Sequence, residues 1–509
     1  MIQLTIDGKT VNADDGATIL DAAKSADIDI PAMCRCGKTV SPVSCFVCAV
    51  KVDGSDTFVP SCAAPICDGM TVDTRSDDVM DCRRRALELM LSDHAGDCDA
   101  PCSRICPSGL DIPEMMRGLV SGNINAAAET VRLSMPLPAT LGHICPAPCE
   151  KGCRRTAVDT AVSIRETHKI IAEKIINSSL HNKKINTASN SKTIGVIGSG
   201  PAGLSAAHFL AVKGYSCTVF ESQSTAGGTL RTQFDESVLP QMILDAEIRL
   251  IEDLGVKFVF NKKIDAVDEI YNDYDSVIIA AGLPDKNQRQ FDLEYNDHGI
   301  KTCRDTSAAS RPKVFACGSS TQSVRMAARA VGQGRSTAVS VDNYLSGKSS
   351  RKQFSMNTGR LSTEETESLI NSIPYAGDND SSSTTGALSD GASRCLQCDC
   401  GKKNSCVLRD MATEYGAHHL HYATGSRKPY IRKRYDGSGL IREPGKCTAC
   451  GRCVSITREK RINPGLAFTG RGSNVQVSAP FDTPFDAAMG EALDECVKSC
   501  PTGALWIIT

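Results

Sequence analysis

Cysteine is the residue that most limits what this chain can fold into, because 25 cysteines occur among 509 residues and most fall into groups with short internal spacings. Cysteine at this density serves either disulfide bridges or metal binding. Disulfide frameworks belong to short secreted chains, whereas this chain is long and opens with a strand-like stretch, Met-Ile-Gln-Leu-Thr-Ile, instead of a secretory leader. The sequence also contains no apolar run long enough to cross a bilayer. We therefore expect a cytoplasmic chain whose thiolates bind metal.

The length of the chain predicts several domains. Its 57 basic and 59 acidic side chains nearly balance, which argues against a dedicated nucleic-acid surface. The expected fold class is multidomain α/β, and its segments are a β-rich domain (1–78), a helical domain (79–185), a βαβ domain (190–347), a solvated linker (348–393) and two cysteine-rich segments (394–440 and 441–509).

The first cysteine group has the order C-x10-C-x2-C-x13-C and consists of Cys34, Cys45, Cys48 and Cys62. Two bridged irons need four thiolates around one compact loop, and this spacing supplies them. A zinc knuckle is the alternative, but the long spacings disfavour it, and Cys36 could replace Cys34. The flanking text, Pro31-Ala-Met-Cys and Ser41-Pro-Val-Ser-Cys-Phe-Val-Cys, resembles the N-terminal [2Fe–2S] domain of the complex I large iron–sulfur subunit and of iron-only hydrogenases. The resemblance implies a β-grasp [2Fe–2S] domain.

The second group has six cysteines, more than one [4Fe–4S] cluster needs, so two clusters are expected. The passages Cys106-Pro-Ser-Gly-Leu-Asp-Ile-Pro and Gly142-His-Ile-Cys-Pro resemble the cluster domain of the glutamate synthase small subunit and of dihydropyrimidine dehydrogenase. The resemblance implies two ligand sets: Cys98, Cys102 and Cys153 for one cluster, and Cys106, Cys145 and Cys149 for the other.

Each of these two sets lacks a fourth ligand. His94 stands four residues before Cys98, and the complex I large subunit has a similar His-x3-Cys, so we expect His94 to be a ligand instead of a surface histidine. In the second set the non-cysteine ligand of the family falls near His168, with Glu166 as the alternative.

A nucleotide-binding fingerprint follows the helical domain. A strand from Thr193 runs into Gly198-Ser-Gly-Pro-Ala-Gly203, then into a helix at 204–212 and a second strand that ends at Glu221. Glycines at these positions let backbone N–H groups approach a pyrophosphate at a helix N-terminus, and the acidic residue accepts hydrogen bonds from ribose hydroxyls.

Two later passages, Gly227-Gly-Thr-Leu-Arg and Val314-Phe-Ala-Cys-Gly, resemble those of glutamate-synthase-type flavoproteins, which implies FAD. In this chain Ser319 replaces the aspartate that is usual after the last glycine. The cofactor-binding residues that the fingerprint and the resemblance imply are Gly198, Gly200, Pro201, Ala202, Gly203, Glu221, Gly227, Gly228, Arg231, Gly282, Gly318 and Ser319.

The flavoproteins of this type carry a complete nicotinamide-binding domain between the two halves of their flavin domain. Here only residues 283–313 lie between those halves, too few for a second βαβαβ unit, and no second G-x-G-x-x-G occurs. We therefore expect a chain that binds FAD and has no NAD(P)H site of its own.

The two last cysteine groups are expected to hold one cluster each. Cys395, Cys398, Cys400 and Cys406 favour a [4Fe–4S] cluster, with zinc as the alternative. Cys447, Cys450, Cys453 and Cys500 resemble one half of a bacterial two-cluster ferredoxin. The other half is disabled, because Thr457, Gly490 and Leu493 occupy positions of expected ligands.

One [2Fe–2S] cluster, three to four [4Fe–4S] clusters and FAD make a series of electron carriers. We therefore expect an oxidoreductase subunit that relays electrons between an NADH-oxidising flavoprotein or a ferredoxin and a catalytic partner such as a hydrogenase or a formate dehydrogenase. No catalytic residue is recognisable. The alternatives are a self-contained FAD-dependent reductase of a small substrate and an assembly subunit with a decayed flavin site.

Overall fold

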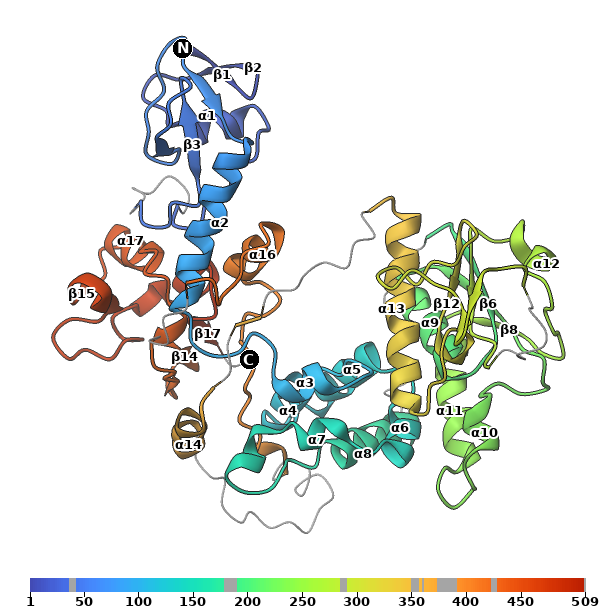
Figure 1. Ribbon diagram of the computed structural model, residues 1–509. Coiled ribbons are helices and arrows are strands. Elements are labelled where there is room, and N and C mark those ends of the chain that lie inside the picture. The colour runs from blue at the N-terminus through green and yellow to red at the C-terminus, as the bar shows by residue number, and fades with distance from the viewer. Residues whose placement is uncertain are drawn as a thin grey trace. The chain divides into compact units, whose positions relative to one another are not determined.

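The computed structural model describes residues 1–35, 43–177, 190–283, 291–348, 357–358, 361–372, 391–422 and 428–507. The chain forms two compact units. Unit 1 consists of Met1–Asp99, Gln353–Pro374 and Cys398–Thr509, and unit 2 of Ala100–Lys352 and Tyr375–Gln397. Unit 1 is therefore built from both ends of the chain, blue and red in Figure 1. Cys36 and most of the predicted linker lie outside the described residues.

The N-terminal part of unit 1 is a five-stranded sheet in the order β2-β1-β5-β3-β4. Its strands are β1 (Ile2–Ile6), β2 (Lys9–Ala13), β3 (Ala49–Val52), β4 (Phe58–Pro60) and β5 (Thr71–Asp73). Between β1 and β2, Asp7 and Gly8 have φ angles of 50° and 79°, as an Asp-Gly hairpin turn requires. Helix α1 (Ile19–Ser25) begins with a capping box made by Thr18 and Asp21 and buries its apolar face in the same core.

Helix α2 (Asp77–Ser92) follows this sheet, and Arg83 ties it to β3 by donating two hydrogen bonds, of 3.0 and 3.1 Å, to the carbonyl of Ala49. The C-terminal part of unit 1 packs a three-stranded sheet in the order β13-β14-β17 with short helices. Its elements are α14 (Thr363–Ser372), α16 (Val407–Glu414), β13 (Lys433–Tyr435), β14 (Leu440–Arg442), α17 (Arg452–Glu459), β15 (Ala467–Thr469), β16 (Gln476–Ser478), α18 (Leu493–Ser499) and β17 (Leu505–Ile507). Helix α14 lies in the segment predicted as a linker.

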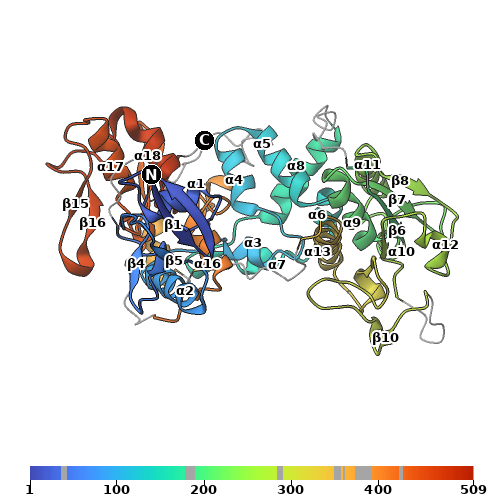
Figure 2. The ribbon, with the colours of Figure 1, turned by 90° about the horizontal axis from the view of Figure 1, so that it is seen from above.

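Unit 2 begins with the predicted helical domain. Its helices are α3 (Pro101–Ile105), α4 (Ile112–Val120), α5 (Ile124–Ser134), α6 (Pro138–Ile144), α7 (Pro148–Lys151) and α8 (Ile164–Asn177). Helix α4 packs on α5 and α6 packs on α8 around a core that contains Met115, Met116 and Ile171 (Figure 2). Among the described residues, no helix combines the length and the apolar character needed to span a membrane.

The second half of unit 2 is a parallel five-stranded sheet in the order β12-β9-β6-β7-β8. The strands are β6 (Thr193–Ile197), β7 (Ser216–Phe220), β8 (Lys257–Val259), β9 (Ser276–Ile279) and β12 (Val314–Ala316). Helix α9 (Pro201–Val212) leaves β6 and packs against α13 (Ala327–Leu345). From β6 the chain adds β7 and β8 on one side of the sheet and then β9 and β12 on the other side. Dinucleotides bind at such a switch point, which here lies between β6 and β9.

The stretch between β9 and β12 is short. Its described residues, 280–283 and 291–313, contain only the two-residue strands β10 (Tyr295–Asn296) and β11 (Gly299–Ile300), which pair with each other. No helix occurs in these described residues, so they do not form a second βαβαβ unit.

Glu247 on α11 (Gln241–Glu252) makes the stability of unit 2 depend on pH. Its buried carboxylate accepts hydrogen bonds from the N–H groups of Ala139 (2.5 Å) and Thr140 (2.9 Å) at the start of α6. Burial nevertheless raises the pKa of Glu247 from 4.5 to about 7. The folded chain therefore retains a proton that the unfolded chain loses above pH 4.5, so stability present below the unfolded pKa is lost as pH rises toward 7. The expected slope is about 1 kcal/mol per pH unit within this window. Thermal unfolding of the cofactor-loaded protein between pH 4.5 and 7 measures this slope. Glu247→Gln should make the unfolding free energy less dependent on pH. Equal slopes for the variant and the wild type would contradict the prediction.

Candidate redox centres

The four cysteines of the first group lie together in the core of the N-terminal sheet. Strands β3 and β4 pair Ala49 with Pro60, which places Cys48 and Cys62 at one end of the hairpin. A hydrogen bond from the Cys62 thiol lowers the pKa of Cys48 to about 6, and the neighbouring Cys34 raises the pKa of Cys45. Four converging buried thiols fit a [2Fe–2S] cluster.

The second site lies in unit 2, in a small cavity bordered by Cys106, Cys145, Cys149 and His168. Cys106 follows α3, Cys145 follows α6, and Cys149 lies on α7. Burial is the main cause that raises the pKa of Cys149, to about 12, and the thiolate of Cys106 adds to it. These are three of the expected thiolates, brought to one cavity from three helices.

His168 on α8 borders this cavity and uses one of its ring nitrogens in a backbone hydrogen bond. Its Nδ1–H donates to the carbonyl of Pro138 at 3.1 Å, which leaves the other ring nitrogen as an acceptor. Burial lowers the pKa of His168 to about 4, so the ring is neutral at physiological pH. The alternative, Glu166, is exposed and lies 3.6 Å from Lys169. Of the two residues, His168 borders the cavity.

Another three cysteines of unit 2, one of them from outside the predicted six-cysteine group, contact the core of the helical domain, as Cys106 and Cys145 also do. Cys102 on α3 and Cys153 after α7 pack against the same core as Cys395. Arg155 donates to the carbonyl of Arg394 at 3.0 Å, and its pKa is raised first by Asp159 and further by the thiolates of Cys153 and Cys395. Cys395 therefore lies with the helical domain, whereas Cys398 begins the last segment of unit 1.

In unit 1, Cys98 lies near two cysteines from the C-terminal segment, Cys400 and Cys406. The backbone N–H of Cys400 donates to the carbonyl of Cys98 at 3.0 Å. Burial and then the thiolates of Cys400 and Cys98 raise the pKa of Cys406 to about 12. Cys98 is thus grouped with Cys400 and Cys406, and Cys102 belongs to unit 2. The sequence could not show this division, because ligands from the two ends of a discontinuous unit leave no local spacing.

His94 lies in unit 1 with Cys98. It is 8% exposed, and burial, followed by the charge of Lys446, lowers its pKa to about 3. Asn357 and Thr358 also contact this segment: the Asn357 side chain accepts from the N–H of Cys98 at 3.1 Å, and Thr358 donates to the carbonyl of Gly96 at 2.6 Å. Both residues were missed by the sequence analysis, since they fall in the segment predicted as a linker.

The last group borders a cavity that Cys447, Cys450, Cys453 and Cys500 line together. Burial raises the pKa of Cys450 to about 12. The positions of the disabled second cluster are filled differently: Thr457 accepts from the N–H of Leu466 at 3.1 Å, and Cys496 belongs to the apolar core. Four thiols therefore converge on one site at this end of the chain.

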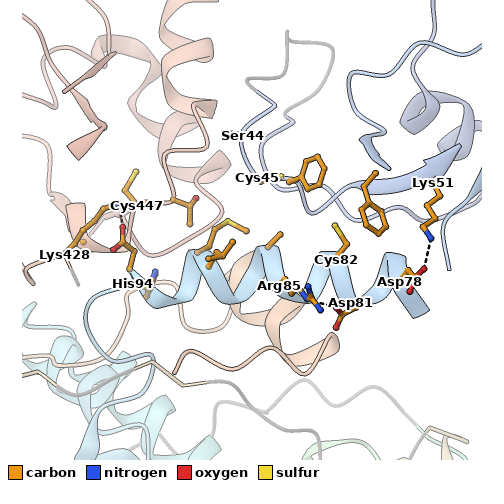
Figure 3. Close-up of a pocket in the computed structure, with 18 of the residues that line it drawn as sticks. Ser44, Cys45, Lys51, Asp78, Asp81, Cys82, Arg85, His94, Lys428 and Cys447 are labelled. Atoms are coloured by element: carbon orange, nitrogen blue, oxygen red, sulfur yellow. Dashed lines mark hydrogen bonds and ion pairs between the residues drawn. The ribbon is translucent and has the colours of Figure 1, made fainter. Parts of the chain in front are cut away.

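A larger cavity of about 800 Å³ lies within unit 1 along α2. Cys45 of the first group and Cys447 of the last group both border it, as does His94 (Figure 3). Lys51 and Asp78 form an ion pair of 2.6 Å at one end. Two candidate cluster sites thus open onto the same cavity.

Among the residues that the structure describes, no three histidine, cysteine or acidic side chains are placed as ligands of a single metal ion. The thiolates of an iron–sulfur cluster bind different irons and stand farther apart than the ligands of one ion.

The nucleotide site is built at the junction of β6 and α9. Gly198 has a φ of 97°, and a Cβ there would lie 2.5 Å from the carbonyl oxygen of Ala280. A Cβ at Gly203 would collide with the carbonyl of Gly198. Gly200, in contrast, has no heavy atom within 4 Å of a Cβ position, so its backbone is open to a ligand. Pro201 begins α9, and Ala202 follows it. The open loop at a helix N-terminus fits a pyrophosphate.

Glu221 follows β7 and faces this loop. Its carboxylate accepts hydrogen bonds from the backbone N–H of Ser199 at 3.0 Å and from Gln223 at 2.9 Å. Burial raises its pKa, but the hydrogen bonds, led by that of the Ser199 hydroxyl, outweigh burial and lower it. Glu221 is therefore an ionised acceptor beside the glycine loop, although part of its capacity is used by Ser199.

Most of the other predicted cofactor residues surround the same loop. Gly228 has a φ of 53°, and its Cβ position lies 3.0 Å from the Cα of Gly200, while the N–H of Gly227 donates to Ser199 at 3.1 Å. Gly318 has a φ of 67° and approaches Ala202, with Ser319 half-buried beside it. Gly282 has a φ of 88° and an open Cβ position.

Arg231 is placed differently. Its guanidinium forms an ion pair with Asp245 and donates to Gln241 at 3.1 Å, both on α11. These contacts hold Arg231 within the protein framework beside the predicted cofactor site.

Comparison with known proteins matches three stretches of the chain to families. Residues 1–77 match a family described as a 2Fe-2S iron-sulfur cluster binding domain. Residues 88–180 match dihydropyrimidine dehydrogenase domain II, 4Fe-4S cluster. Residues 196–258 match an NAD(P)-binding Rossmann-like domain. The chain thus contains two iron–sulfur domains and a dinucleotide-type domain.

Three curated relatives are oxidoreductase subunits. The chain is 33% identical over 208 residues to the NADP(+)-dependent formate dehydrogenase subunit beta of Moorella thermoacetica, covering 36% of this chain and 29% of the relative. It is 28% identical over 207 residues to the NADPH-Fe(3+) oxidoreductase subunit beta of Geobacter sulfurreducens (40% and 30%). It is 33% identical over 190 residues to the NAD-dependent dihydropyrimidine dehydrogenase subunit PreT of Escherichia coli O157:H7 (36% and 46%). The chain spans less than half of the length of each, so the similarity is one of shared redox domains.

Proposed function

We propose that this chain is an electron-transfer subunit of a multisubunit oxidoreductase and that it binds FAD together with one [2Fe–2S] and up to four [4Fe–4S] clusters. The observation that carries the proposal is the gathering of cysteines at five separate places in the two units, together with a dinucleotide-type fold. One-electron carriers in series with a flavin, which handles one or two electrons, form a relay.

The ligand sets that we propose follow the grouping in the structure. The [2Fe–2S] set is Cys34, Cys45, Cys48 and Cys62. Unit 1 would hold two [4Fe–4S] sets: His94 with Cys98, Cys400 and Cys406; and Cys447 with Cys450, Cys453 and Cys500. Unit 2 would hold the other two: Cys102 with Cys153 and Cys395; and His168 with Cys106, Cys145 and Cys149. Cys398 remains a proposed ligand without an assigned site. The flavin would lie against Gly200 and Glu221.

Donor and acceptor are proposed to lie on other chains. The described residues between β9 and β12 contain no second dinucleotide unit, which supports a chain without its own NAD(P)H site. Two of the relatives are subunits of an NADP(+)-dependent formate dehydrogenase and of an NADPH-Fe(3+) oxidoreductase. We infer a cytoplasmic partner that oxidises NADH or supplies reduced ferredoxin, and a catalytic partner such as a hydrogenase or formate dehydrogenase.

The composition of the purified chain tests this function. Protein isolated without oxygen is expected to contain about one FAD and 14 to 18 irons per chain, from one two-iron and three to four four-iron clusters. Absorbance, flavin release and iron analysis measure both. A chain that carries iron but no flavin would overturn the flavin relay, and a chain that carries zinc in place of iron would overturn the electron-transfer function itself.

Reduction by nicotinamide nucleotides tests the missing site. The isolated, loaded chain should be bleached by dithionite but should react with NADH or NADPH at least about 100-fold more slowly than it does once its partner subunit is added, because hydride transfer requires the nicotinamide to be held against the flavin. Stopped-flow absorbance under anaerobic conditions measures these rates. Rapid bleaching of the isolated chain by either nucleotide would show that the short segment between β9 and β12 does not exclude such a site.

A further inference from the structure

Several deeply buried charges of unit 1 surround the carboxylate of Glu443. The side chains of Glu443 and Lys446 are each 1% exposed, and that of Arg432 is 8% exposed. Glu443 accepts hydrogen bonds from Lys446 Nζ (2.7 Å), Arg432 Nε (2.9 Å), the Tyr430 hydroxyl (2.5 Å) and Trp506 Nε1 (3.2 Å). We call these five residues the Glu443 cluster. Its two cations and one anion give the cluster one net positive charge, and the buried Asp399 carboxylate nearby is itself paired with Lys403 at 2.9 Å.

The Glu443 cluster packs directly on the segment that carries Cys98. A Cβ added to Gly96 would lie 2.8 Å from the ring of Tyr430 and 3.0 Å from Lys446 Cε. The neighbouring backbone is joined to the same turn, since the N–H of Ala95 donates to the carbonyl of Gly445 at 2.9 Å. Gly96 has a φ of 89°, so a side chain at this position would be strained and would press on Tyr430 and Lys446.

The same charges approach the segment that carries Cys400. A Cβ added to Gly503 would collide with the Cys400 sulfur and would lie 3.5 Å from Lys446 Cδ. Arg432 Nη2 lies 3.4 Å from the carbonyl of Asp399, the residue before Cys400. Two glycines, Gly96 and Gly503, therefore allow the Lys446 side chain to lie against both thiol-bearing segments.

The Lys446 ammonium forms an ion pair in this interior, with Nζ 2.7 Å from Glu443 Oε2. Glu443 stays ionised, because Lys446 and Arg432 overcome the effect of burial and lower its pKa to about 2. Charges held in a poorly polarisable interior act strongly on their neighbours.

We propose that Lys446 is a positioning residue that raises the reduction potential of the cluster at Cys98, Cys400 and Cys406 by holding a positive charge beside the Cys400 thiolate. The inference rests on the proposed function, since it requires a cluster at this site. Reduction adds one electron from an external donor and neither makes nor breaks a bond. The added negative charge is stabilised by the neighbouring cation, so the reduced form is favoured.

Charge-changing variants test the proposal through the sign of the shift. In an EPR-monitored titration with dithionite, Lys446→Met should lower the midpoint of the cluster whose signal is lost in Cys400→Ala. At the midpoint potential of the wild-type cluster, the ratio of oxidised to reduced cluster in Lys446→Met should be about tenfold higher. For one electron this corresponds to a shift of about 59 mV. Lys446→Arg should stay near the wild type. Glu443→Gln removes a negative charge and should shift the midpoint upward.

The control is Lys51→Met, which removes a cation of unit 1 that pairs with Asp78 at 2.6 Å, outside the Glu443 cluster. It should leave this midpoint unchanged. Shifts of Lys446→Met and Glu443→Gln in the same direction, or no shift in either, would overturn the role of charge. If Lys446→Met loses its iron, Glu443→Gln alone decides: an upward shift supports the proposal and an unmoved midpoint overturns it. A wild-type chain without any cluster signal would instead contradict the proposed function.

Discussion

Gly200→Val is expected to purify with the iron content of the wild-type chain and without its flavin. The Cβ position of Gly200 meets no protein atom within 4 Å, and its φ of −67° and ψ of 178° are allowed for valine, so the fold should tolerate the side chain. The pyrophosphate of a dinucleotide, however, must approach the backbone at this glycine. We expect at least about a tenfold loss of flavin affinity, equivalent to about 1.4 kcal/mol. Fluorescence of the released flavin and iron analysis on the same sample measure the result.

Gly437→Val is the matched control for this variant. Its Cβ position is also free of neighbouring atoms, and it lies in the turn between β13 and β14 of unit 1. This control should retain both flavin and iron. Wild-type flavin content in Gly200→Val would show that the nucleotide does not lie against the glycine loop, whereas loss of iron from Gly200→Val would show a general folding defect.

Substitution of single cysteines should sort the cluster signals by compact unit and not by distance along the sequence. We expect Cys98→Ala and Cys400→Ala to remove the same EPR signal and about four irons each, because the two residues share one site in unit 1. Cys102→Ala should remove a different signal, the one that Cys395→Ala also removes. The comparison needs only the four variants, purified without oxygen and examined at a common potential.

The matched control for these four is Cys303→Ala, an exposed thiol outside every proposed set. It should retain all signals. If Cys98→Ala and Cys102→Ala remove one signal in common while Cys400→Ala removes another, the ligand sets implied by family resemblance would be correct and the grouping proposed from the structure would be wrong.

Motifs confined to one stretch of chain could be predicted from the sequence. The Asp7-Gly8 turn and the strand–loop–helix order around Gly198 depend on neighbouring residues, and both are found as predicted. Cys447 and Cys450, three positions apart in one loop, border one cavity, and their role as cluster ligands stays a prediction. Such features are set by local backbone geometry, which a sequence pattern reports directly.

The grouping of Cys98 with Cys400 could not be predicted in this way. Cys102 comes only four positions after Cys98, and Cys398 three positions after Cys395, but each pair is divided between the two units. Cysteine spacing predicts that neighbours in sequence share a cluster. It cannot indicate that a compact unit is built from segments far apart in the sequence, as unit 1 is. The same limitation applies to Asn357 and Thr358, whose polar, small-residue surroundings are typical of a linker.

The two-ended construction of unit 1 imposes an order on biosynthesis. A ribosome releases Cys106, Cys145 and Cys149 well before Cys400 and Cys406, and domains fold as they emerge. The site in unit 2 can therefore receive its iron while the chain is still being made, whereas the site that joins Cys98 to Cys400 must wait for the C-terminal segment. We expect maturation of that cluster to be a late step, before which the Cys98 thiol, buried in the folded chain, has not yet met Cys400.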